Sequence, residues 1–281
     1  MVGFLSRLAK FFSIMYKIME NKKEFRQISE LFEGIVSIRS LIKAMEDKVS
    51  DRRIITLYYN EKNTVSNKSE YAWLRHRAED FGFLIEICDE AFFEENTVGN
   101  THGGVAAKCS ERSFPSPEFY PDNIKNKSFF VMLDGIEDPY NFGYALRTFY
   151  AAGVDGVILP PRNRMVTAGI VCRASAGASE LMPMYCLETD KAADFMKSKG
   201  FTVVCADLRD SVPVYEASLR YPLFLIVGGE KRGISRAVLE KSDVRVRLDY
   251  ARDFNASLSA ASAASVIAYE IYRQNKYENA K

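Results

Sequence analysis

The sequence predicts an α/β protein in which a larger, mostly parallel sheet follows a smaller α/β unit. After residue 128, short apolar strand segments alternate with helical segments, which is the order expected of a parallel sheet with helices on both faces. Between residues 110 and 127 the composition changes, because three prolines stand among polar residues. Such a stretch is typical of a linker, and we place a domain boundary there.

Residues 1–23 are expected to form a helical extension. Large apolar side chains recur at helical spacing, whereas basic residues interrupt the run, so neither a membrane span nor a secretory signal peptide is predicted. Packing on the protein's own core or on a partner subunit is the first interpretation. Binding to a membrane surface is the alternative.

Residues 24–109 are predicted to form a small α/β domain. Helices are expected at 35–45 and 69–81, the second ended by Gly82, and strands at 53–59 and 83–88. A last short strand is expected after the turn that begins at Thr101. His102 in that turn is interpreted as a hydrogen-bonded turn residue rather than a catalyst.

Residues 128–281 are predicted to form the second domain. Its strand candidates are short apolar runs: 129–133, 154–159, 182–186, 201–206, 223–227 and 244–248. Its helices include 190–199, 234–241 and about 256–274. The run 129–133 is continuously apolar, which favours a strand buried on both faces.

Composition limits the class of protein. A length of 281 residues allows two domains, and a net charge of +1 gives no global basic signature for nucleic acid, although local patches are possible. The five cysteines are scattered without a C-x-x-C pair, and there are only two histidines. We therefore expect no metal site, no disulfide framework and a cytoplasmic location.

The stretch 133–153 combines a strand end, a polar turn and a helix. Asp138-Pro139 breaks the strand, Asn141 is a candidate N-cap, and Gly153 is a candidate left-handed stop. Arg147 lies off the apolar stripe of this helix, which comprises Phe142, Ala145, Leu146 and Phe149. The stretch thus predicts one guanidinium group near the carboxyl end of a strand, where ligands gather in open α/β sheets.

Two later stretches each end at the start of a predicted helix. In 225–235, Gly228 and Gly229 end an apolar strand, and glycine lets a ligand approach the backbone. The chain has neither a P-loop nor a G-x-G-x-x-G pattern, which disfavours a phosphate-binding NTPase or a dinucleotide enzyme. In 253–261, a polar loop enters the last helix. Each stretch alone would indicate only a turn and a helix cap.

Together and in this order, the three stretches resemble the SpoU (TrmH-like) family of RNA 2′-O-ribose methyltransferases, in the SPOUT superfamily. The matching residues are Asp138-Pro139, Asn141, Gly143 and Arg147-Thr148 for motif 1, Gly228, Glu230 and Gly233 for motif 2, and Asn255 and Ser257 for motif 3. The segment 174–178 is also similar to a family segment. The resemblance covers roughly 128–275, and extends more weakly to 30–109, which look like the family's RNA-recognition domain.

The resemblance implies a C-terminal α/β trefoil-knot (SPOUT) domain and a smaller N-terminal α/β ribosomal-protein-like RNA-binding domain. It also implies that the knot loops bind S-adenosyl-L-methionine without a metal, and that the knot domain forms a homodimer. The residues implied in cofactor contacts, largely through their backbone, are Ala206, Gly228, Gly229, Val246, Leu248 and Phe254. In that interpretation, close approach of the cofactor explains why glycine stands at Gly228 and Gly229.

The implied reaction is methyl transfer from S-adenosyl-L-methionine to a ribose 2′-hydroxyl of RNA. Arg147 is the central candidate, and Asn141, Glu230, Asn255 and Ser257 are expected to shape the site. Arg147 would act either as a base or as a charged clamp on RNA, and we favour the clamp because guanidinium resists deprotonation. Cations near the motifs are candidate phosphate contacts or, alternatively, solvated surface charges: Arg162, Arg164, Arg173, Lys231, Arg232 and Arg252.

Two features of the sequence bear on the substrate and on the activity. The near-neutral charge and two-domain layout favour ribosomal RNA as the substrate, with transfer RNA as the alternative. Asp253 and Phe254 stand where the family usually has serine and leucine. A carboxylate there could alter the target-ribose pocket, and it leaves open a non-catalytic RNA-binding or assembly factor of the same fold.

Overall fold

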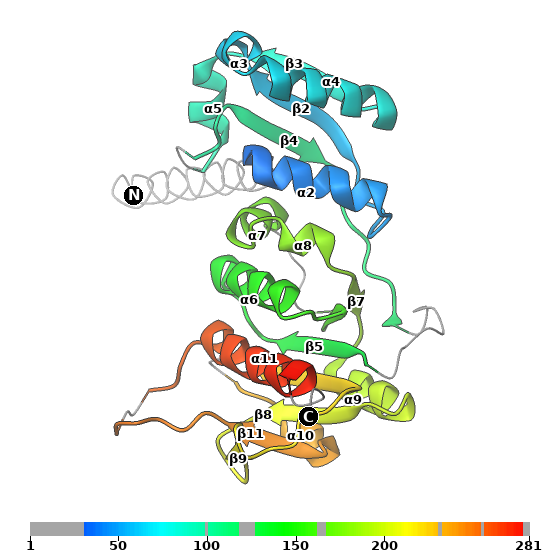
Figure 1. Ribbon diagram of the computed structural model, residues 1–281, viewed down its shortest axis with the longest axis vertical. Coiled ribbons are helices and arrows are strands. Elements are labelled where there is room, and N and C mark those ends of the chain that lie inside the picture. Colours follow the sequence, from blue (N-terminus) through cyan, green and yellow to red (C-terminus); the bar gives the residue numbers. More distant parts are fainter. Residues whose placement is uncertain are drawn as a thin grey trace, which may run out of the picture.

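The computed structural model describes residues 31–98, 101–117, 127–161, 167–229, 232–253 and 256–277. Two sheets follow one another along the long axis of the molecule (Figure 1). The smaller sheet belongs to the first part of the chain and the larger one to the second. The predicted helical extension at 1–23 lies outside the described residues.

The smaller sheet has the strand order β1-β4-β2-β3. Its strands are β1 (Leu31–Glu33), β2 (Ile54–Asn60), β3 (Leu84–Cys88) and β4 (Val105–Cys109). Its helices are α2 (Gly34–Glu46), α3 (Glu61–Ser66), α4 (Lys68–Phe81) and α5 (Glu90–Asn96). β4 pairs antiparallel with β1 and β2, whereas β2 and β3 are parallel.

Most of the predicted elements in this part are confirmed. The expected helices 35–45 and 69–81 correspond to α2 and α4, and Gly82 ends α4 in the left-handed conformation, with φ at +73°. His102 is a hydrogen-bonded turn residue, because its Nδ1 accepts the Gly104 N–H at 3.0 Å. The sequence analysis missed α3, which buries none of its residues and so shows no apolar periodicity.

The larger sheet has the strand order β7-β6-β5-β10-β8-β11-β9, and its neighbouring strands pair in parallel. Its strands are β5 (Phe129–Asp134), β6 (Gly156–Leu159), β7 (Met184–Cys186), β8 (Thr202–Ala206), β9 (Val212–Pro213), β10 (Leu223–Gly228) and β11 (Val244–Arg247). Its helices are α6 (Pro139–Ala151), α7 (Ala168–Ala174), α8 (Ala178–Leu181), α9 (Thr189–Ser198), α10 (Arg236–Lys241) and α11 (Ala260–Tyr277). The predicted parallel sheet is therefore confirmed.

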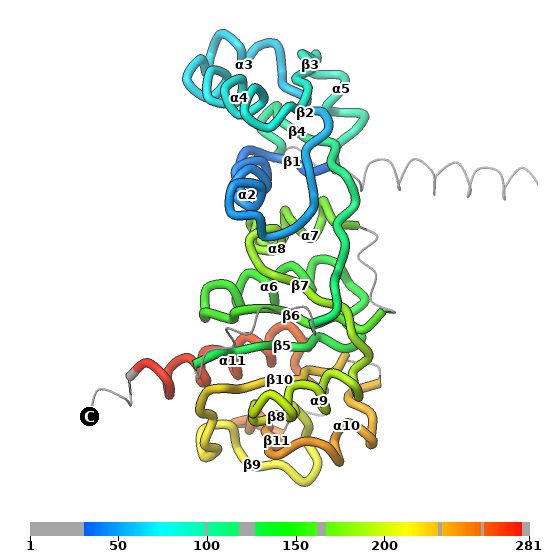
Figure 2. Tube along the Cα trace, turned by 90° about the vertical axis from the view of Figure 1, so that its right-hand side faces the viewer, coloured from blue at the N-terminus to red at the C-terminus, as the bar shows by residue number. Residues whose placement is uncertain are grey.

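Helices cover both faces of this sheet. Figure 2 shows α6 and α11 on one side and α9 and α10 on the other. Alternate residues of β5 divide between the two faces: Val131 and Leu133 pack with α6 and α11, whereas Phe130 and Met132 pack with α9 and α10. Full burial of each such side chain contributes about 1.5–3 kcal/mol. This two-sided burial confirms the interpretation of the apolar run.

Two predicted helix starts are wrong. The N-cap of α6 is Asp138, whose carboxylate accepts the Asn141 N–H at 2.7 Å, and Pro139 stands in the first turn. Asn141 is thus inside the helix and does not cap it. α11 begins at Ala260 rather than near residue 256, because Ser259 Oγ accepts the Ser262 N–H at 3.1 Å.

Among the described residues, no helix is both long and apolar enough to cross a membrane. In the same part of the chain, no three His, Cys, Asp or Glu side chains are grouped so that they could hold a metal ion.

Candidate active site

The carboxyl ends of four neighbouring strands meet at one edge of the larger sheet. β10 pairs with β5, with Gly228 opposite Asp134, and with β8, with Val227 opposite Ala206. β11 continues the sheet on the far side of β8, with Val246 opposite Ala206. Because these pairings are parallel, the loops that follow the four strands leave from the same edge.

A cavity of about 410 Å³ lies at this edge, within the size range of small-molecule sites. It is bounded by the ends of β8, β10 and β11, by the loop before α11, and by the first part of α11. We call it the strand-end cavity, and its lining consists of Ala206, Asp207, Leu208, Arg209, Val227, Gly228, Gly229, Gly233, Val246, Arg247, Leu248, Tyr250, Ser257, Leu258, Ala260, Ala263 and Ile267.

The wall of the strand-end cavity is mostly apolar and carries one fixed carboxylate. Leu248, Leu258 and Ile267 supply aliphatic surface. The Asp207 side chain is 11% exposed, and its Oδ1 accepts the backbone N–H of Arg209 at 2.8 Å. The Asp207 N–H donates in turn to the carbonyl of Val246 at 3.1 Å. An acidic acceptor is thus held beside an apolar surface.

Tyr250 holds the loop that closes the strand-end cavity. Its hydroxyl oxygen accepts the backbone N–H of Leu258 at 3.0 Å, and both residues line the cavity. This hydrogen bond joins the two ends of the loop that carries motif 3. The loop then passes into α11 at the Ser259 cap.

Glycine is needed at Gly228 and Gly229 for a reason other than the predicted close approach of a cofactor. A Cβ atom on Gly228 would lie 2.5 Å from the carbonyl carbon of Gly233, and one on Gly229 would lie 2.1 Å from the carbonyl oxygen of Gly135. The Gly229 N–H also donates to the carbonyl of Asp134 at 2.6 Å. Gly228 is therefore required by packing within the loop after β10, and Gly229 by packing against the loop after β5, whether or not a ligand approaches them.

The residues predicted to contact a cofactor come together. Five of the six, far apart in the sequence, line the strand-end cavity: Ala206, Gly228, Gly229, Val246 and Leu248. The sixth, Phe254, lies outside the described residues. The sequence analysis missed Asp207, Arg209 and Tyr250, which also line the cavity. Their positions in the sequence could have indicated them, because each stands within three residues of the end of β8 or β11.

The predicted catalytic residues do not all reach the strand-end cavity. Ser257 lines it, whereas Arg147 and Asn141, both on α6, do not. Arg147 is on the exposed face of α6. One face of α11 contacts α6, where Ser265 Oγ lies 3.1 Å from Thr148 Oγ1, and another face lines the cavity through Ala263 and Ile267. Glu230 and Asn255 lie outside the described residues.

The candidate RNA-contacting cations differ in their surroundings. Arg232 and Arg252 are exposed on the loops that follow β10 and β11. Arg173 is half-buried, and its guanidinium forms an ion pair with Glu33 at 2.7 Å, so its charge is already used within the protein. The remaining three, Arg162, Arg164 and Lys231, lie outside the described residues.

The part of the chain that carries this cavity matches a known family. The model of the SpoU rRNA Methylase family matches residues 128–269. The chain belongs to this family. A TrmH-family relative from Staphylococcus haemolyticus is 35% identical to it over 184 residues, which are 64% of this chain and 74% of the relative. As a SpoU family member, the protein is an RNA methyltransferase, and the methyl donor of the family is S-adenosyl-L-methionine.

Solved structures share the fold. An RNA 2′-O ribose methyltransferase aligns with a TM-score of 0.68 at 22% identity, covering 90% of this chain and 95% of that one. An rRNA methyltransferase from Sinorhizobium meliloti, solved with AdoMet bound, aligns with a TM-score of 0.72 at 21% identity, covering 90% of this chain and 94% of that one. These likenesses confirm the predicted SpoU fold class. The trefoil knot itself stays a prediction.

Proposed function

We propose that this SpoU family member transfers a methyl group from S-adenosyl-L-methionine to a ribose 2′-hydroxyl of RNA, and that the strand-end cavity holds the cofactor. The observation that supports the proposal most strongly is the convergence of the predicted cofactor residues. Ala206, Gly228 and Leu248 come from three separate strand ends, yet they line one cavity. Two of the solved structures, an RNA 2′-O ribose methyltransferase and an rRNA methyltransferase with AdoMet bound, fit the proposal.

The residues of the cavity suit this cofactor. The aliphatic surface of Leu248, Leu258 and Ile267 matches the flat adenine ring, and the Asp207 carboxylate can accept hydrogen bonds from hydroxyl or ammonium groups. Bound there, S-adenosyl-L-methionine would supply an electrophilic methyl group on its sulfonium. Tyr250 would keep the closing loop in place through its hydrogen bond with Leu258.

We propose that the protein acts as a homodimer. The outward faces of α6 and α11 carry exposed apolar and aromatic side chains, which we call the aromatic face: Tyr140, Tyr144, Val266 and Tyr269, exposed by 36%, 53%, 39% and 48%. Large exposed apolar side chains grouped on one surface mark interaction sites. A two-fold axis would pack this face against the same face of a second copy.

Such a dimer would complete the active site. Arg147 lies one helical turn beyond Tyr144 on α6, and the first turn of α11 lines the strand-end cavity. Packing of the aromatic faces would therefore bring Arg147 of one subunit toward the cavity of the other. This arrangement explains why Arg147 does not line the cavity of its own chain.

We propose that Arg147 acts as a charged clamp. Its planar guanidinium can bind an RNA phosphate through two hydrogen bonds and stabilise negative charge that develops on the 2′-oxygen. Guanidinium is rarely deprotonated in proteins, which makes direct base catalysis the weaker alternative. Ser257, with Asn255, Asn141 and Glu230, is proposed to position the target ribose.

The RNA substrate is proposed to be ribosomal, with transfer RNA as the alternative. We propose residues 24–109 as the RNA-recognition domain, 110–127 as the linker, and 128–281 as the catalytic domain. Arg232 and Arg252 are the described cations best placed to contact phosphate, since both are exposed on strand-end loops. A non-catalytic assembly factor would bind RNA without transferring a methyl group.

Calorimetry and methyl transfer test the proposal together. Chelator-treated protein is expected to bind one S-adenosyl-L-methionine per chain, and to transfer labelled methyl groups to total RNA. Ala263→Leu should fill part of the strand-end cavity and weaken cofactor binding by about tenfold, the effect of 1.4 kcal/mol. Ala72→Leu, an exposed position in α4, is the matched control. Absence of binding by the wild-type chain would remove the cavity from the proposal.

A further inference from the structure

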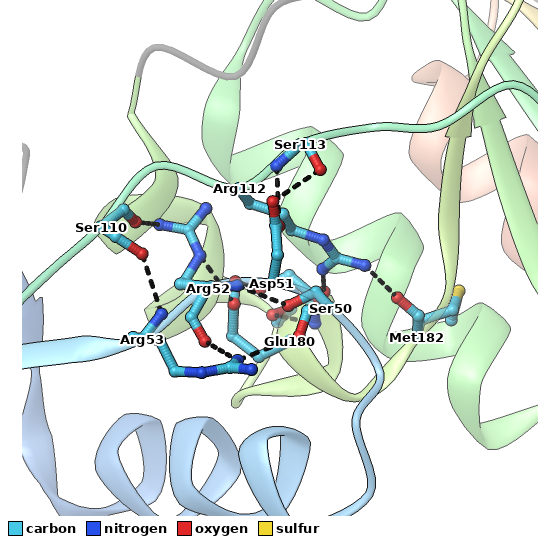
Figure 3. A network of polar contacts seen from close by, with 11 residues as sticks. Ser50, Asp51, Arg52, Arg53, Ser110, Arg112, Ser113, Glu180 and Met182 are labelled. Carbon is cyan, nitrogen blue, oxygen red and sulfur yellow. Dashed lines mark hydrogen bonds and ion pairs between the residues drawn. The ribbon is translucent and has the colours of Figure 1, made fainter. Parts of the chain in front are cut away.

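A buried ionic cluster joins the two parts of the chain (Figure 3). Arg52 Nε lies 3.1 Å from Glu180 Oε2, and the two side chains are only 8% and 1% exposed. The buried Arg112 guanidinium donates to the carbonyls of Ser179 and Met182, both at 2.8 Å. We call Arg52, Arg112 and Glu180 the inter-domain cluster.

The inter-domain cluster connects three separate segments. Arg52 precedes β2 and Arg112 follows β4, so both belong to the segments that frame the smaller sheet, whereas Glu180 lies in α8 beside the larger one. Arg52 also donates to the carbonyl of Ser110 at 3.1 Å. The start of the predicted linker is thus anchored on both sides rather than loosely extended.

The charges of the cluster depend on one another. Two guanidinium groups and one carboxylate are removed from water, which is tolerated only while opposite charges stay together. Burial lowers the pKa of Arg112, and the neighbouring Glu180 carboxylate opposes that effect. At the edge, Asp51 accepts the Ser113 N–H at 2.9 Å and its hydroxyl at 2.6 Å, which holds the Arg112 segment in place.

Close packing continues from the cluster to the candidate catalytic helix. A Cβ atom on Gly177, at the start of α8, would lie 1.9 Å from Ser40 Oγ of α2. A Cβ atom on Gly143 of α6 would lie 2.6 Å from the Cβ of Ala174 in α7. Gly143 is one helical turn before Arg147. Movement of α2 would therefore be transmitted to the helix that carries Arg147.

The contact between the two parts resembles a protein core. Cys172 of α7 is fully buried in one cluster with Ile38 and Leu41 of α2. Beside it, Arg173 and Glu33 form a further ion pair between the parts, at 2.7 Å. An interface of this kind does not fit two domains that move independently on a flexible linker.

We propose that the inter-domain cluster is a positioning device that holds the RNA-recognition domain at one fixed distance and orientation from Arg147. The inference rests on the proposed function. It implies that the substrate is a folded RNA, in which the recognised feature and the target ribose keep a fixed geometry, rather than an unstructured strand. Arg52, Arg112 and Glu180 are thus positioning residues and do not touch the reacting atoms.

The test uses the full-length protein and a folded RNA that the wild type methylates. Glu180→Gln leaves two buried guanidinium groups without their carboxylate, and is expected to lower kcat/KM for RNA by about tenfold or more. Cofactor affinity should stay within about twofold, because the strand-end cavity is untouched. Mapping of methylated nucleotides should show that the label spreads from the wild-type site to neighbouring riboses. The double variant Arg52→Glu with Glu180→Arg should recover part of both losses.

A matched control separates positioning from general loss of an ion pair. Asp47→Asn removes the exposed Lys43–Asp47 pair of α2, whose side chains are 57% and 47% exposed, and should change neither kcat/KM nor site choice. Should Glu180→Gln fail to fold, Arg52→Lys keeps the charge and loses the planar fork, and a loss of about threefold is expected. Wild-type site choice and kcat/KM in whichever of these two cluster variants folds would overturn the inference.

Small-angle X-ray scattering tests the cluster independently of activity. Glu180→Gln, or Arg52→Lys in its place, should show a larger radius of gyration than the wild type, because loss of the ion-pair geometry loosens the contact between the two parts. Identical scattering curves would overturn the inference. If the wild type methylates no RNA, the proposed function fails, whereas this comparison still decides whether the cluster fixes the domains.

Discussion

Gly229 packs so closely on Gly135 that a Cβ atom on Gly229 would lie 2.1 Å from the Gly135 carbonyl oxygen. This contact joins the loop after β5, which leads to Arg147, with the loop after β10, which lines the strand-end cavity. Gly135 itself has a φ of +89°, a conformation that favours glycine. The two motifs are therefore fitted to each other through their backbones.

Gly229→Ala should disrupt the strand-end cavity. The new methyl group cannot be accommodated without a backbone shift, and overpacking of this kind costs roughly 1–3 kcal/mol. Cofactor affinity should fall by about tenfold or more, because Gly229 lines the cavity. Denaturant unfolding and calorimetry would measure the two effects.

The matched control is Gly200→Ala. Gly200, unlike Gly229, has a positive φ, +83°, and a Cβ atom there would meet nothing within 4 Å. Backbone strain of about 1–2 kcal/mol is expected without any change in cofactor affinity. Equal effects of the two substitutions on cofactor binding would contradict the role assigned to Gly229.

The sequence predicted most of the larger sheet because its strands are apolar on both faces. Phe130 and Val131 face opposite helical layers, so two apolar residues in succession indicated a strand buried on both faces. The predicted cap at Asn141 was wrong because Asp138, three residues earlier, has the same capping chemistry. Local signals of this kind compete, and only the fold decides between them.

The site was less predictable than the fold. The convergence of Ala206 and Leu248 on one cavity follows from strand order, which the residues alone do not reveal. The separation of Arg147 from that cavity depends on the packing of α6 against α11, which is a tertiary property. The buried pair of Arg52 and Glu180 joins residues remote in the sequence, and no local pattern indicates it.

Arg147→Lys should lose most methyl transfer while the rest of the protein stays intact. Lysine keeps the charge but cannot form the two parallel hydrogen bonds of a guanidinium, and a loss of about 100-fold in kcat is expected. Cofactor affinity and oligomeric state should not change, because lysine keeps the positive charge and Arg147 is not one of the residues of the aromatic face. Single-turnover assays would measure the loss.

Arg236→Lys is the control for Arg147→Lys, since Arg236 is an arginine on α10 with a side chain 92% exposed. It should transfer methyl groups at the wild-type rate. A near wild-type rate for Arg147→Lys would exclude Arg147 from the mechanism. A rate that rises with pH in wild type but not in Arg147→Lys would favour the base role over the charged clamp.

Tyr144→Asp should convert the proposed dimer to a monomer. Tyr144 is 53% exposed in the middle of the aromatic face, and a buried unpaired carboxylate at an interface is strongly unfavourable. Light scattering should give twice the chain mass for the wild type and the chain mass for the variant. Tyr215→Asp, 63% exposed in the loop after β9 and outside the aromatic face, should stay dimeric. A monomeric wild type would refute the proposed interface.

Glu270 on α11 should make the stability of the fold depend on pH in the acid range. The pKa of Glu270 lies below its ordinary value of 4.5, because Arg273 and Gln274 donate hydrogen bonds to its carboxylate. A lowered pKa means that the carboxylate stabilises the fold above pH 4.5, and that this contribution is lost as the pH falls through the folded-state value.

Glu270→Gln should therefore destabilise the protein near neutral pH, and the difference from the wild type should shrink as the pH falls below the ordinary value of 4.5. Denaturant unfolding near neutral pH and at a pH below 4.5 would measure the difference in the free energy of unfolding. Glu240→Gln, in an exposed pair with Arg236, should show little effect at either pH. A difference between Glu270→Gln and the wild type that does not depend on pH would contradict the assignment.

The position of the transferred methyl group on the RNA tests 2′-O-methylation most directly. RNA is labelled by the full-length protein with S-adenosyl-L-methionine carrying a radioactive methyl group, and is then hydrolysed in alkali. Alkaline cleavage uses the 2′-hydroxyl as the nucleophile, so a 2′-O-methylated ribose leaves an alkali-stable dinucleotide. The label is expected in dinucleotides, because the proposed target is the ribose 2′-hydroxyl. Label in mononucleotides, which indicates methylation of a base, would contradict it.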